Sequence, residues 1–187
     1  GDIFPELQEH IEGLEFAKQE VPDIIRGLTP EQFNWRAQEG TWSVGECIDH
    51  LYKTGFHLTE PLKDAVEKAQ REGRTAAGPF KYGFLGSWFV NAASIPKDPD
   101  KGKFKAPKLY VPASDLDAED LIPKFLLLQD DFIEITRAAN GLDLKKIKVA
   151  SPALNILRLS IGLWLKLIPI TKSVIFSRPE ESSRNAQ

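Results

Sequence analysis

Apolar residues recur at spacings of about three and four along four long stretches of the chain, which is the periodicity of an amphipathic α-helix. These stretches cover residues 4–28, 43–71, 117–139 and 151–176. The last of them is apolar on almost every side, as expected of a helix in the middle of a bundle or at an interface. The pattern therefore predicts four long helices.

Local signals set several of the predicted helix ends. Thr29 can cap a short helix that Gln32 closes as a capping box, and Ser43 and Glu46 can form the same pairing at the start of the second long helix. Pro61 falls inside that second helix and removes one backbone donor from it, so we expect a kink at this position.

Residues 73–116, between the second and third predicted helices, are rich in Gly, Pro and Lys. Within them we expect a short helix over residues 82–93, followed by an extended course that the prolines impose. The chain shows no alternating strand pattern and no internal repeat. We therefore predict an all-α four-helix bundle with a long crossover between helices two and three. The polar tail, residues 179–187, is expected to be disordered.

Composition narrows the classes of partner. The 187 residues carry 24 Lys and Arg against 27 Asp and Glu, a net charge of −3, so no basic field favours nucleic acid. No stretch of about 20 residues lacks charge, so no membrane span is expected. Residues 1–10 lack a cationic segment followed by an apolar run, and the chain has one cysteine. These features lead us to expect a cytoplasmic protein.

Few side chains can bind a transition metal through nitrogen or sulfur. The only candidates are His10, Cys47, His50 and His57. On the second predicted helix, Cys47 precedes His50 by one turn and could chelate a metal with it, and Glu46 could orient the imidazole. The alternative interpretation is structural: His50 forms a hydrogen bond inside the bundle, and Cys47 packs as a small apolar side chain.

Several segments together resemble the DinB-like superfamily of damage-inducible and YfiT-related proteins. They are residues 28–35 (LTPEQFNW), 42–51 (WSVGECIDHL), 82–89 (YGFLGSWF) and 104–108 (FKAPK), and the resemblance extends over about residues 1–178, taken as a single domain. It implies a four-helix bundle of up-down-down-up topology that is often dimeric. It also implies zinc or nickel, held by one histidine of helix two and a His-x-x-x-His pair of helix four. Characterised relatives include metal-dependent hydrolases and thiol-dependent transferases.

His50 matches the first of these family ligands. Alignment of the fourth helix by its apolar pattern places Thr171 and Ile175 where the His-x-x-x-His pair would fall. His57 cannot replace them, because seven residues separate it from His50 by about 10.5 Å along a helix. We therefore expect an incomplete metal site and no tightly bound zinc. The predicted ligand pocket consists of Trp42, Glu46, Cys47, His50, Trp88 and Thr171.

Three functional hypotheses remain, and no catalytic residue can be assigned from the sequence. One is a mainly structural or oligomerising role, with the apolar fourth helix buried in a dimer; the other two involve a ligand or a metal. In the first of these two, the bundle binds a small ligand or a partner without metal chemistry. In the alternative, the protein is a metal-dependent hydrolase or a thiol-dependent transferase in which His50 and carboxylates hold zinc or nickel. Those carboxylates would come from Glu46 or from Asp130, Asp131 and Glu134 on the third helix. A homodimer is expected from the resemblance and from the apolar fourth helix.

Overall fold

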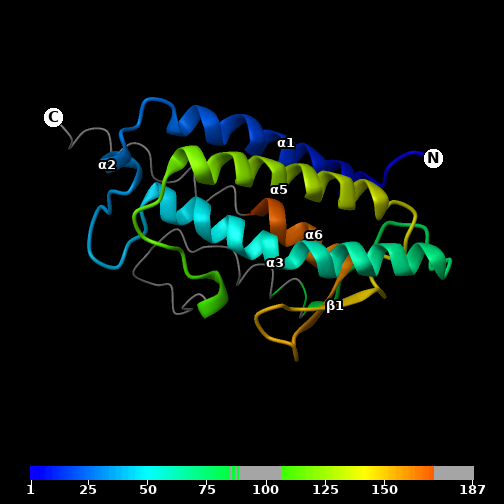
Figure 1. Ribbon diagram of the computed structural model, residues 1–187. Helices are drawn as coiled ribbons and strands as arrows, with labels where there is room; N and C mark the ends of the chain where they lie inside the picture. Colours follow the sequence, from blue (N-terminus) through cyan, green and yellow to red (C-terminus); the bar gives the residue numbers. More distant parts are fainter. Residues whose placement is uncertain (85, 87, 89–106, 171–187) are drawn as a thin grey trace.

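The computed structural model describes residues 1–84, 86, 88 and 107–170 (Figure 1). This part of the chain is mostly helical, with one small antiparallel hairpin. Its elements are α1 (Pro5–Ile25), α2 (Pro30–Phe33), α3 (Val44–Arg71), the 3-10 helix η2 (Lys108–Tyr110), α5 (Ala118–Ala138), β1 (Lys148–Ala150), β2 (Arg158–Ser160) and α6 (Ile161–Ile170).

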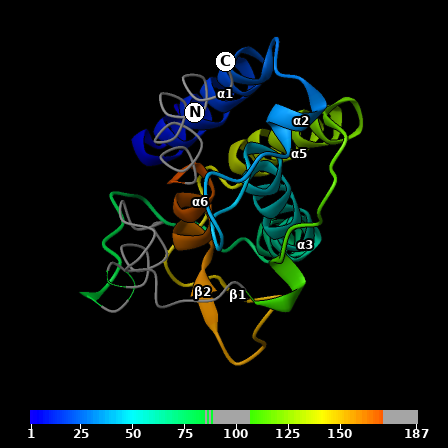
Figure 2. The ribbon, with the colours of Figure 1, turned by 90° about the vertical axis from the view of Figure 1, so that its left-hand side faces the viewer.

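The long helices α1, α3 and α5 lie side by side (Figure 1). The start of α1 meets the end of α5, where the Phe4 amide donates to the Asn140 side chain over 2.9 Å, so these two helices are antiparallel. Helices α3 and α5 run in the same direction, since Gln70 near the end of α3 donates to the Ala138 carbonyl over 2.8 Å. Helix α6 packs against α1 (Figure 2).

The predicted helix starts near residues 29, 43 and 117 are confirmed. Thr29 and Gln32 form a reciprocal capping box at α2, and Ser43 and Glu46 form another at α3. Asp117 caps α5 through the Glu119 amide. These side chains satisfy backbone N–H groups that have no partner inside a helix.

The prediction of a helix beginning at about residue 151 is wrong. Residues 148–150 and 158–160 instead pair as a hairpin, with Val149 opposite Leu159, and α6 begins only at Ile161. Both central residues of the strands are buried while Lys148 and Arg158 are exposed, which is the alternation of a half-buried sheet. Strands of three residues are too short for that alternation to stand out against a predicted helix.

Some predictions fall on residues that the structure does not describe. They are the greater part of the short helix over 82–93, the prolines between 96 and 106, the continuation of the fourth helix beyond 170, and the tail over 179–187.

Two apolar clusters meet along α3. The larger one contains Leu7, Leu62 and Phe132 together with the first half of α6. The smaller one joins Phe33 and Ile48 to both α1 and the start of α5. Since the first half of α6 is buried within one chain, its apolar character does not by itself require a dimer. Within the described part of the chain, no helix has both the length and the apolar character needed to cross a bilayer.

Candidate functional site

The candidate site lies near the start of α3, where His50 is half-buried. The Nδ1 atom of His50 is 2.7 Å from the backbone carbonyl oxygen of Tyr110. The indole of Trp42, just before the cap of α3, lies against the imidazole with ring centroids 4.8 Å apart and a tilt of 46°. The ring of His50 is therefore held on one side by a backbone carbonyl and covered by an aromatic face.

These contacts determine the tautomer of His50. A carbonyl oxygen only accepts hydrogen bonds, so Nδ1 carries the proton and Nε2 has the lone pair. Burial lowers the pKa of His50, and this outweighs the opposing effects of the Tyr110 carbonyl and Asp49. The imidazole is consequently neutral at neutral pH, and Nε2 can accept a hydrogen bond or coordinate a metal.

Residues 110–113, here called the strap, are tied to α3 by three polar side chains. His50 binds the Tyr110 carbonyl, the Lys53 ammonium donates to the Val111 carbonyl over 3.0 Å, and Asp49 accepts from the Ala113 amide over 2.8 Å. Asp49 and Lys53 also pair with each other at 3.0 Å. Sequence reasoning missed Asp49 and Lys53, although their i,i+4 spacing with opposite charges marked them as partners.

Glu46 is occupied at the start of α3. Its carboxylate accepts from the Ser43 amide over 2.8 Å and from Nε of Arg36 over 2.9 Å, and the terminal nitrogen of Arg36 gives a second contact. Burial alone would raise the pKa of Glu46, but the hydrogen bonds from Arg36 and Ser43 hold it below its usual range. The contacts described for Glu46 thus stabilise the helix start.

The other predicted pocket residues are only partly placed. Cys47 lies three positions before His50 on α3 and is buried in the core. Trp88 is 56% exposed. Thr171 lies outside the described residues. The structure therefore brings Trp42 and His50 into contact but does not describe a pocket lined by the whole predicted set.

Two of the residues that could complete a metal site make other contacts. The ring of His57 faces Phe56 and Tyr110, at centroid distances of 5.5 and 6.4 Å. Asp130 pairs with Lys18. No three His, Cys, Asp or Glu side chains within residues 1–84, 86, 88 and 107–170 are grouped so that they could hold a metal ion. The donor set of the described chain does not fit the three-histidine centre of the family.

The remaining histidine, His10, is buried on α1. It is 7% exposed, and its Nε2 atom has no hydrogen-bond partner among the described residues. Burial lowers the pKa of His10 to about 4.

The fold and the site together define a class of protein. It is a mostly helical protein that holds a histidine in one orientation near the start of its second long helix. A family model described as the DinB superfamily matches residues 14–164, well over half of the chain. The chain therefore belongs to the DinB superfamily, and the resemblance of its sequence segments is confirmed. No curated protein and no solved structure gives a significant match.

Proposed function

We propose that this protein is a DinB-superfamily bundle that binds a small ligand at Trp42 and His50 without the three-histidine metal centre. The observation that carries the proposal is the bond between Nδ1 of His50 and the Tyr110 carbonyl. It leaves Nε2 as an acceptor beside an indole face. Such a pair suits a ligand that has a planar apolar part and a hydrogen-bond donor at its edge.

The absence of histidines from the fourth helix supports this proposal. The sequence contains no histidine after His57, so helix four cannot supply the His-x-x-x-His pair. A neutral imidazole with one fixed tautomer keeps its capacity for binding even without those ligands.

We infer the up-down-down-up topology of the superfamily, with a fourth helix that begins later than the sequence pattern predicts. The antiparallel contact of α1 with α5 and the parallel course of α3 and α5 support it. Homodimerisation and a cytoplasmic location also belong to the proposal. Light scattering tests the first, and cell fractionation tests the second.

The experiment for ligand binding is a thermal-shift screen of small aromatic compounds that carry an N–H or O–H donor. We expect compounds that raise the melting temperature of the wild type to lose this effect in His50→Asn and in Trp42→Leu. His57→Asn serves as the matched control, because it removes another half-buried imidazole of α3. Hits that stabilise His50→Asn as strongly as the wild type would contradict the proposal.

The alternative is a metal-dependent hydrolase or thiol-dependent transferase. One observation favours it: a histidine whose Nδ1 donates to a carbonyl presents Nε2 as metal-ligating histidines do. Elemental analysis of protein purified without chelator decides between the two. About one equivalent of zinc or nickel per chain, lost in His50→Asn, would establish the alternative and overturn the first proposal.

A further inference from the structure

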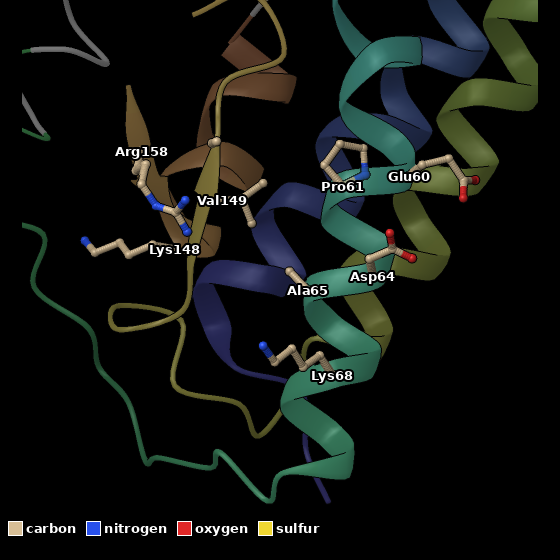
Figure 3. A pocket seen from close by; sticks show the side chains of 9 residues that line it. Glu60, Pro61, Asp64, Ala65, Lys68, Lys148, Val149 and Arg158 are labelled. Carbon is tan, nitrogen blue, oxygen red and sulfur yellow. The ribbon is translucent and has the colours of Figure 1, made fainter. Parts of the chain in front are cut away.

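A groove separates the C-terminal half of α3 from the β-hairpin (Figure 3). Its volume is about 450 Å³, within the range of small-molecule sites. Its floor is apolar and consists of Pro61 and Ala65 from α3 and Val149 from β1. Since Pro61 follows His50 by 11 residues on one helix, the groove lies about 16 Å along α3 from that histidine.

Two cations of the hairpin line this groove, Lys148 and Arg158. In the strand register Lys148 is opposite Ser160 and Arg158 is opposite Ala150, so the two cations are diagonal neighbours on the same face. An anion close to both would offset the repulsion between these two like charges. No carboxylate of the described residues forms an ion pair with either of them.

A third cation reaches the groove from α3. Figure 3 shows Pro61, Ala65 and Lys68 on the side of α3 that faces the hairpin, and the ammonium of Lys68 extends toward it. Its contact with Glu72 is long, at 3.9 Å, and both side chains are largely exposed, so this pair holds Lys68 weakly.

Two carboxylates also belong to the lining, Glu60 and Asp64. In Figure 3 both point away from the hairpin, on the other side of α3. In the same view the ammonium of Lys148 extends away from α3, so Arg158 and Lys68 are the cations that an anion in the groove would meet first. Because the whole chain has a net charge of −3, this positive region is a local feature and not a general attraction for anions.

We propose that this groove binds a small organic anion. A carboxylate or phosphate ester lies against Arg158, whose planar guanidinium can form a bidentate hydrogen bond with it, and Lys68 and Lys148 add further positive charge. The apolar body of the ligand covers Pro61, Ala65 and Val149. The site uses no residue of the Trp42 and His50 site, so it extends the function proposed above.

Isothermal titration calorimetry with hexanoate and hexyl phosphate tests the proposal. Both anions are expected to bind the wild type. Hexyltrimethylammonium has the same hexyl chain and the opposite charge, and it is not expected to bind. Arg158→Glu is expected to weaken binding about tenfold or more, since it replaces a charge-assisted hydrogen bond by repulsion. Lys145→Glu makes the same change of charge on an exposed residue outside the lining and is expected to retain binding.

A second variant tests the apolar floor without changing any charge. Ala65→Phe fills the space between α3 and the hairpin and is expected to abolish binding of both anions. His50→Asn is expected to leave the binding unchanged, which separates this site from the proposed function. Far-UV circular dichroism checks that each variant is folded. If Arg158→Glu does not fold, the double variant Lys148→Gln with Lys68→Gln takes its place.

Three results would overturn the proposal. In the first, neither anion binds the wild type. In the second, hexyltrimethylammonium binds as well as the anions do. In the third, the anions bind Arg158→Glu, and Lys148→Gln with Lys68→Gln, as tightly as they bind Lys145→Glu.

Discussion

His50 and Tyr110 are 60 positions apart, yet Nδ1 of the histidine donates to the carbonyl of the tyrosine over 2.7 Å. The histidine that matches the metal ligand of the superfamily therefore also anchors the strap. Asp49 and Lys53 hold the following residues of the strap from the same helix. Any substitution of His50 thus changes two things at once, the Nε2 acceptor and the anchor.

Two substitutions separate these roles. His50→Asn can keep a donor near the position of Nδ1, whereas His50→Ala removes it and leaves the half-buried Tyr110 carbonyl without this partner. We expect His50→Ala to lower the free energy of unfolding by about 1–2 kcal/mol and His50→Asn to lower it less. Urea unfolding measures both. The amide of Ala113 is expected to exchange its hydrogen faster in His50→Ala. Equal stability of the two variants would show that the hydrogen bond to Tyr110 does not anchor the strap.

The ion pair of Glu46 with Arg36 predicts a dependence of stability on pH. The pKa of Glu46 is lowered in the folded protein, so the unfolded chain takes up a proton first as the pH falls. The stabilisation is therefore fully present above the unfolded pKa of about 4.5 and is lost as the pH falls through the lower folded value. Glu46→Gln is expected to reduce this acid-dependent loss while retaining an acceptor for the Ser43 amide. Thermal unfolding between pH 3 and pH 6 measures the loss of stability in the wild type and the variant, and Glu31→Gln at an exposed position is the control.

His10 predicts a second pH dependence at a higher pH. Its pKa falls from 6.5 to about 4 because of burial, and nearby Lys166 lowers it further while Glu9 opposes the shift. Between these two pH values the unfolded chain binds a proton that the folded chain does not, so stability decreases as the pH falls from about 6.5 to about 4. The full loss is about 3 kcal/mol.

His10→Leu removes this titration and also the buried nitrogen that has no partner among the described residues. We expect the variant to show a smaller loss of stability between pH 6.5 and pH 4 in urea unfolding. His57→Leu, the removal of a half-buried imidazole from α3, is the matched comparison. If His10→Leu retains the full slope of the wild type, burial of His10 is not its cause.

Short-range signals made much of the fold predictable. The capping boxes Thr29 with Gln32 and Ser43 with Glu46 depend on residues three positions apart, and both are confirmed. The hairpin was not predictable in this way, because strands of three residues carry too little alternation to outweigh the apolar run that follows.

The candidate site was likewise predictable only where its residues are close together in the sequence. Trp42 and His50 belong to one short motif, and the structure places them in contact. The strap reaches α3 from more than 50 positions away and contributes backbone atoms, which every residue type possesses. The groove at the hairpin could not be predicted either, since β1 falls in a stretch without any predicted element and β2 falls in the predicted fourth helix.

Gly55 in the middle of α3 gives the last prediction. Glycine costs a helix interior about 1 kcal/mol relative to alanine, so packing must explain its presence. A Cβ atom at this position would lie 2.8 Å from Leu128 and 2.9 Å from Phe132 of α5, closer than atoms can approach without movement. Gly55→Ala therefore gains helix propensity but forces the buried side chains of Leu128 and Phe132 to shift, and we expect a net loss of about 1–2 kcal/mol in the free energy of unfolding. Leu128→Ala on the same background removes one of the two contacts, so the loss in the double variant is expected to be smaller than the sum of the single losses. Additive losses in urea unfolding would show that the approach of the two helices at Gly55 is looser than this geometry requires.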